Sequence, residues 1–142
     1  MRKILTAGLL VASLVSLAAC GRGGTKSNPP VVLSSALKSG SGLNAGGEAP
    51  LWALQIRAKE INFSSEKISA ITVTNAGPTG STNGAVWSGE AGGRPFHATI
   101  TAQACKDAAT GLTYPLSADV EAVGFTYHGC ATKAGQGLGP PG

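Results

Sequence analysis

Phe96-His97-Ala98-Thr99-Ile100-Thr101-Ala102 alternates apolar and polar residues along its whole length. This period of two is typical of a β-strand with one face in a hydrophobic core. Residues 116–123 repeat the pattern, and residues 51–56 and 68–74 are rich in strand-forming side chains. In residues 116–123, four apolar side chains are expected to face the core: Leu116, Ala118, Val120 and Ala122.

Turn-forming residues separate these short strands. After the first 19 residues, no run of helical period reaches about ten residues. We expect further strands at 85–88 and 125–128, and a loop over 75–84. Short strands between turns of Gly, Pro, Asn and Ser predict an all-β fold. The expected architecture is a small antiparallel barrel or sandwich with one disulfide, preceded by a signal peptide and a flexible tether.

The first residues of the chain are typical of a secretory signal peptide. Met1-Arg2-Lys3 is positively charged, residues 4–19 are apolar, and small residues precede Cys20. This apolar run, about 16 residues, is shorter than the roughly 20 that a membrane-spanning helix needs. The segment resembles a bacterial lipoprotein signal, which implies cleavage before Cys20 and acylation there with chains such as palmitate. By the same resemblance, Gly21 favours the outer membrane, facing the periplasm.

Composition divides the chain into four parts. Residues 1–19 form the predicted signal peptide. Residues 20–48 begin with Cys20, which the resemblance implies is lipidated, and their richness in Gly, Ser and Pro predicts a flexible tether. Residues 49–131 hold the expected strands of the β domain. Residues 132–142 are rich in Gly and Pro and are expected to be a disordered tail.

The charge of the chain points to no polyanionic partner. It has 11 Lys or Arg and 7 Asp or Glu, and Arg2 and Lys3 belong to the predicted signal. The remaining basic residues are scattered, which argues against nucleic-acid binding. The expected partners are the membrane, through the lipid on Cys20, and an envelope protein or a small ligand.

Two cysteines remain once Cys20 is lipidated, and they permit one pairing. An exported protein meets an oxidising compartment, so Cys105 and Cys130 are expected to form a structural disulfide. A redox pair or a metal site is the alternative, although the sequence has no Cys-x-x-Cys spacing.

Three segments carry a family resemblance. They are residues 105–115 (CKDAATGLTYP), residues 124–130 (GFTYHGC) and residues 46–52 (GGEAPLW). Together they resemble a family of uncharacterised small bacterial envelope proteins, over about residues 46–131. Ala49 is an insertion relative to that family, and Ala109-Thr110 replaces its usual Met-Ser. The resemblance implies the fold, the disulfide and the envelope location, and it implies no activity.

Residues with a candidate role are few. We expect Asp107 to accept backbone N–H bonds in its turn and Gly111 to adopt a positive φ. His97 and His128, with the scattered acids and serines, form no catalytic or metal-binding motif, so no catalytic residue, no metal and no cofactor are expected. The candidate binding residues are the following: Trp52, Trp87, Asp107, Tyr114 and Tyr127.

These observations favour a non-enzymatic envelope lipoprotein with a ligand- or protein-binding β domain. The first alternative is an inhibitor of lytic enzymes, by analogy with the architecture of periplasmic lysozyme inhibitors. The second alternative is a hydrolase.

Overall fold

The computed structural model describes residues 42–81 and 83–138, and its all-β architecture confirms the predicted fold class. The predicted signal peptide, Cys20 and most of the predicted tether lie outside the described residues. Eleven strands run through the described part of the chain. In order they are β1 (Leu43–Glu48), β2 (Leu51–Ile56), β3 (Glu60–Ser65), β4 (Ile71–Thr74), β5 (Thr79–Ser81), β6 (Gly84–Ala91), β7 (Arg94–Thr101), β8 (Cys105–Lys106), β9 (Thr113–Tyr114), β10 (Leu116–Ala122) and β11 (Phe125–Lys133).

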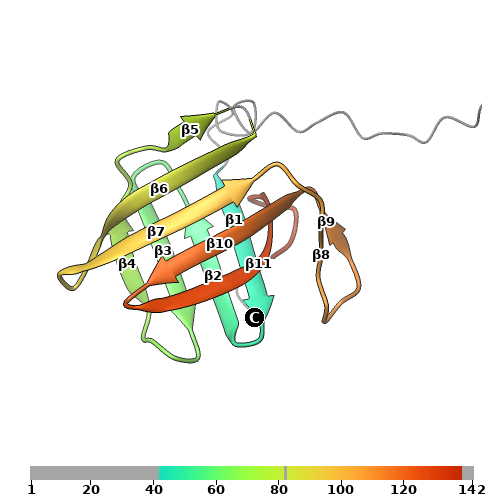
Figure 1. Ribbon diagram of the computed structural model, residues 1–142, viewed down its shortest axis with the longest axis horizontal. Coiled ribbons are helices and arrows are strands. Elements are labelled where there is room, and N and C mark those ends of the chain that lie inside the picture. Colours follow the sequence, from blue (N-terminus) through green and yellow to red (C-terminus); the bar gives the residue numbers. More distant parts are fainter. Residues whose placement is uncertain (1–41, 82, 139–142) are drawn as a thin grey trace, which may run out of the picture.

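Nine strands form one antiparallel sheet in the order β4-β3-β2-β1-β11-β10-β7-β6-β5. The sheet curls into a half-barrel (Figure 1). The pairing of β1 with β11 joins the first four strands to the later ones. The short β8–β9 hairpin forms a separate sheet and stands out from one side of the half-barrel (Figure 1).

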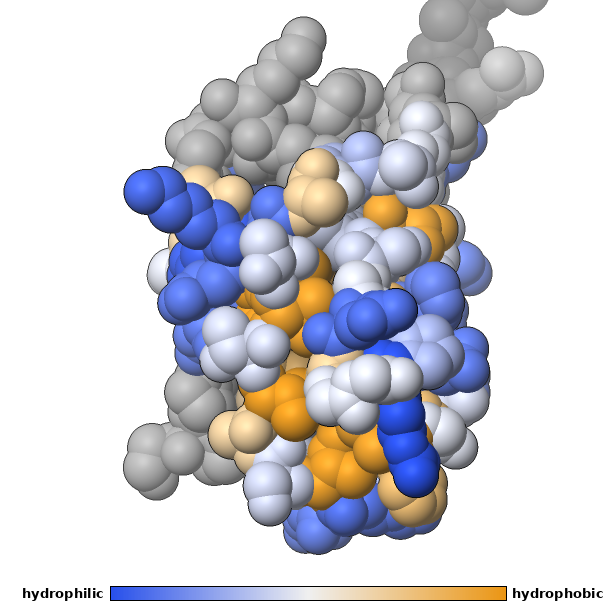
Figure 2. All heavy atoms as spheres, turned by 90° about the vertical axis from the view of Figure 1, so that its left-hand side faces the viewer, coloured by the Kyte–Doolittle hydropathy of each residue, from blue (hydrophilic) through white to orange (hydrophobic). Residues whose placement is uncertain are grey.

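The curled sheet approaches itself where its end strand β4 lies against β6, the strand next to the other end. A Cβ on Gly89 of β6 would overlap the Val73 side chain of β4, so the absence of a side chain there lets the two strands approach. Apolar atoms show between polar ones on this side of the molecule (Figure 2). Val73 is buried and Ile71 is half-buried at this seam, which is closed by packing of side chains.

The alternating residues supply the core, as the sequence predicts. Phe96, Ala98 and Ile100 of β7 are fully buried, and so are the four inward residues of β10. An aromatic cluster forms the centre, with Phe63 at 5.0 Å from Tyr127 and 6.1 Å from Phe96 between ring centroids. Such tilted and edge-to-face pairs stabilise a core beyond the area that they bury.

The prediction of a flexible tether over residues 20–48 is wrong for its last residues, because Leu43–Glu48 forms strand β1 between β2 and β11. Two of the six residues of β1 are glycines, so its sequence is typical of a tether, although both faces of the strand are covered. Leu43 and Ala45 face the core, and Asn44 on the other face donates from Nδ2 to the carbonyl of Gly137 at 3.3 Å. The segment after β11 therefore covers the outer face of β1.

The predicted tail also begins later than expected. β11 continues to Lys133, and Thr132 is buried. The backbone N–H of Ala134 donates to the carbonyl of Gly42 at 3.2 Å, which ties this segment to the start of β1. Two smaller differences concern loops: the predicted loop 75–84 contains β5, and the predicted strand 68–74 is ordered as strand only from Ile71.

The predicted disulfide is confirmed. Cys105 of β8 bonds Cys130 of β11 across 25 residues of sequence, with the two Cα atoms 5.4 Å apart. Cys130 is buried and Cys105 is half-buried. The bond therefore fastens the base of the projecting hairpin to the central strand of the sheet.

Removal of this disulfide is expected to destabilise the domain. Cys105→Ala and Cys130→Ala should each lower the free energy of unfolding by about 2–5 kcal/mol, the usual cost in small secreted domains. The double variant should lose about as much as either single variant, because all three lack the same bond. Chemical denaturation of the oxidised protein measures the loss. Two alkylatable thiols at these positions in the native protein would contradict the pairing.

Candidate binding site

One candidate site lies where the β1–β2 connection approaches the β8–β9 hairpin. β1 ends at Glu48, a cis Ala49-Pro50 peptide makes the turn, and β2 begins at Leu51. The turn is built from the segment GGEAPLW, which places two glycines just before it and Trp52 just after it.

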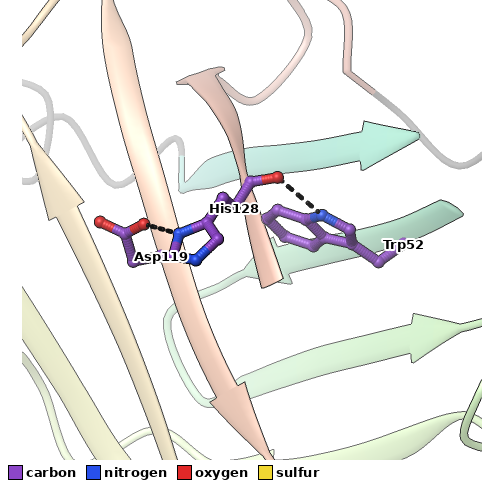
Figure 3. Close-up of polar contacts among 3 residues, drawn as sticks. All are labelled: Trp52, Asp119 and His128. Atoms are coloured by element: carbon purple, nitrogen blue, oxygen red, sulfur yellow. Dashed lines mark hydrogen bonds and ion pairs between the residues drawn. The ribbon is translucent and has the colours of Figure 1, made fainter. Parts of the chain in front are cut away.

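Trp52 connects this turn to the core. Its indole Nε1 donates to the carbonyl of His128 in β11 at 3.2 Å (Figure 3). Its ring lies 6.0 Å from Phe63 and 6.1 Å from Tyr127 between centroids, and the side chain is only 3% exposed. A tryptophan buried in this way needs a partner for its N–H, and the His128 carbonyl is that partner.

Glycines make room for the indole. A Cβ on Gly47 would lie 2.6 Å from both the His128 carbonyl oxygen and Nε1 of Trp52. A Cβ on Gly129 would overlap the Gly46 carbonyl and lie 2.9 Å from Cζ2 of Trp52. Any side chain at these two positions would therefore push β1, β11 or the indole out of place.

The hairpin loop is fixed by Asp107, as expected from the sequence. One carboxylate oxygen of Asp107 accepts the backbone N–H of Thr110 at 3.0 Å and also the Thr110 hydroxyl. The Gly111 N–H donates to the Asp107 carbonyl at 2.9 Å, and Gly111 has the expected positive φ of 70°. The Thr110 hydroxyl and N–H lower the pKa of the Asp107 carboxyl, which is therefore ionised at neutral pH.

A hollow of about 210 Å³ lies between these two segments, and we call it the hairpin hollow. The β1–β2 connection lines one side with Gly46, Gly47, Glu48, Leu51 and Trp52. Asp107, Thr110, Tyr114 and Leu138 line the other side. Glu48 and Asp107 are the two carboxylates among these lining residues, which include no Lys, Arg or His.

The structure brings three of the five predicted binding residues to the hairpin hollow: Trp52, Asp107 and Tyr114. The prediction is wrong for the other two. Trp87 is 1% exposed and Tyr127 is fully buried, so both are core residues. Trp87 lies opposite the small Ala98 on β7, which leaves room for its ring inside the barrel. The Tyr127 hydroxyl is satisfied by Ser65 Oγ at 2.9 Å.

Sequence reasoning missed Glu48, Leu51, Thr110 and Leu138 as lining residues. The signal for the first two was present, since both belong to the GGEAPLW segment that carries the family resemblance. Leu138 had no such signal, because it follows the last strand and reaches the hollow only through the return of the chain after Lys133.

The two histidines stand on the outer face of the sheet and line no part of the hairpin hollow. His128 Nδ1 pairs with Asp119 Oδ1 on the neighbouring strand, while the His128 backbone carbonyl accepts from Trp52 (Figure 3). His97 Nδ1 lies 3.1 Å from the Ser88 hydroxyl. All four of these side chains are exposed, so they form surface pairs between adjacent strands.

Across residues 42–81 and 83–138, no three His, Cys, Asp or Glu side chains gather to hold a metal ion. The same residues contain no helix that is both long enough and apolar enough to cross a membrane. Compared with known proteins, the chain matches no family model, no curated protein and no solved structure.

Proposed function

We propose that this protein is a lipid-anchored protein of the bacterial cell envelope whose β domain binds a ligand in the hairpin hollow without catalysing a reaction. The predicted signal segment and Cys20 support the anchor. The geometry of residues 46–52 and 107–114 supports the binding site.

The observation that carries the binding proposal is the convergence of two remote segments on one hollow. The GGEAPLW segment supplies one wall and the loop after Cys105 supplies the other. The disulfide holds the base of the hairpin, and the bonds between Asp107 and Thr110 hold its loop. A site that is rigid before binding loses less entropy when the ligand arrives.

The lining residues indicate the chemistry of the ligand. Leu51, Tyr114 and Leu138 offer apolar and aromatic surface, and Glu48 and Asp107 offer negative charge. Trp52, only 3% exposed, supports the hollow from the core. A ligand with an apolar body and a cationic or hydrogen-bond-donating group would complement them. The hydroxyl of Thr110 donates to Asp107, so the alcohol at this hollow is engaged in holding the loop. This supports a binding role over a hydrolytic one.

Binding is tested with phenethylammonium, an aromatic cation, added to the ¹⁵N-labelled full chain in detergent micelles. We expect chemical-shift changes at Gly46, Gly47 and Thr110, and weaker changes with the anion phenylacetate. Glu48→Gln should weaken binding about two- to fivefold, as the loss of an exposed charge pair does. Glu90→Gln, an exposed acid on β6 outside the hollow, is the matched control and should change nothing. Shifts scattered over the whole domain, or none, would refute the site.

A specific feature favours the inhibitor of lytic enzymes as a second candidate function. Leu112 is 57% exposed in the loop of the hairpin, just before β9, and the disulfide fastens this hairpin at its base. A rigid loop with an exposed apolar residue suits insertion into the cleft of another protein. Inhibition of a peptidoglycan-cleaving enzyme that Leu112→Ala abolishes would favour this candidate over small-ligand binding.

The lipid anchor is tested separately. Cys20→Ser lacks the thiol that would carry the lipid, so labelled palmitate should not enter the protein, and the protein should leave the membrane fraction. Two or more acyl chains are needed for stable anchoring, so loss of this attachment should release the domain. Gly23→Ser, a small substitution close to the same site, should keep the label. Wild-type labelling of Cys20→Ser would refute the anchor.

A further inference from the structure

The hairpin hollow does not end at Trp52. A second hollow of about 210 Å³ shares Leu51 and Trp52 with it and is also lined by Ala53, Ser64, Ser65 and Glu66. A third, of about 150 Å³, shares Ala53 and Ser64 with the second and continues past Gln55, Asn62 and Thr72. We call the second and third hollows together the outer trough. Because neighbouring hollows share lining residues, the hairpin hollow and the outer trough lie side by side along β2, and we call this row of hollows the depression.

Small side chains create the outer trough. Ala53 of β2 and Ser64 of β3 are directly opposite each other in the sheet, and both point away from the core. The next outward pair, Gln55 and Asn62, is larger and carries amide groups. The depression therefore follows two strands, with hydroxyl and amide groups along it. The Asn62 amide is engaged by Glu60 and Thr72. The Ser64 hydroxyl and the Gln55 amide are therefore the groups that can match the alternating N–H and C=O groups of an extended polypeptide.

The ionisable groups along the whole depression are all acidic. Glu48 and Asp107 line the hairpin hollow, and Glu66 lines the outer trough. Lys67, the next residue, is directed instead to the Phe125 ring, with its Nζ 5.3 Å from the ring centroid. In the described residues as a whole, acids and bases are nearly balanced, so this one-sided distribution is local. It favours a positively charged partner and repels nucleic acids.

We propose that the ligand is an extended, positively charged polypeptide segment that lies along the hairpin hollow and the outer trough. This inference rests on the proposed function, because it takes the hairpin hollow to be a binding site. To the proposed function it adds how far the binding site extends and which class of ligand it takes. An uncharged glycan would use the hydroxyl and amide groups but would gain nothing from the three carboxylates.

The probe is a peptide of about eight residues that alternates lysine and alanine, roughly 27 Å long when extended. Added to the ¹⁵N-labelled full chain in micelles, it should shift amides of both the hairpin hollow and the outer trough. Glu66→Gln should weaken binding about two- to fivefold, and affinity should fall as salt is raised. A peptide that alternates glutamate and alanine, and a neutral chito-oligosaccharide, should bind more weakly.

Ala53→Arg blocks the outer trough with bulk and with a like charge. It should reduce peptide binding at least tenfold while leaving the phenethylammonium shifts at Gly46 and Thr110 in place. Thr99→Arg is the matched control, because it adds the same side chain to the outer face of β7, outside the depression. Thermal melting checks that both variants fold.

The outcomes separate this inference from the proposed function. Peptide shifts confined to the hairpin hollow, or equal binding of the acidic peptide or the glycan, would overturn the extended cationic ligand and leave the hairpin hollow standing. Loss of phenethylammonium and peptide binding alike would overturn the proposed function itself. Binding of the peptide to both regions, sensitive to Ala53→Arg and insensitive to Thr99→Arg, is the result that supports the inference.

Discussion

Trp52 packs its indole ring against Phe63 and Tyr127, and it fits there because Gly47 and Gly129 carry no side chains. The same ring donates its N–H to the carbonyl of His128, so one side chain joins β2 to the central strand β11. The close approach of β1 to β11, at Gly46 and Gly129, depends on the same absence of side chains. The half-barrel is therefore held together at the place where its first and last described strands meet.

This constraint also positions the candidate site. The β1–β2 connection leaves the sheet immediately beside Trp52, so its Glu48 and Leu51 are carried to the rim of the barrel. The disulfide brings the hairpin to the same rim from the other side, because Cys130 lies next to Gly129 in β11. Core packing, the disulfide and the hairpin hollow thus depend on a few neighbouring residues of β11. A substitution at one of these residues would therefore alter all three.

The strands predicted correctly from the sequence are those with one buried face and one face exposed to water. Phe96 to Ala102 and Leu116 to Val123 alternate because one face is buried and the other meets water. β1 escaped prediction because it contains Gly46 and Gly47, which close packing against β11 and Trp52 requires but which in the sequence are typical of a flexible tether. Alternation within a strand cannot show how far its surroundings cover its outer face.

The candidate site was predictable in part, for a related reason. Asp107 and Tyr114 lie in a segment whose turn chemistry is local, and local chemistry can be recognised in a sequence. Trp87 and Tyr127 were misassigned because an aromatic residue on a strand suits a core and a binding rim equally well. Which one it occupies depends on its cross-strand neighbour, and the small Ala98 opposite Trp87 is known only once the strands are paired.

Because Gly129 has no side chain, β1 and the Trp52 indole can approach β11 closely, and Trp52 can join the barrel to the hairpin hollow. The most direct measurement is the free energy of unfolding of Gly129→Ala, compared with Gly84→Ala, where an added Cβ meets nothing closer than 3.6 Å. We expect Gly129→Ala to lose about 1–3 kcal/mol or more, as overpacked cores do, with a displaced indole N–H resonance of Trp52. Gly84→Ala should stay within about 0.5 kcal/mol of the wild type. Equal stability of the two variants, with an unchanged Trp52 resonance, would contradict the account.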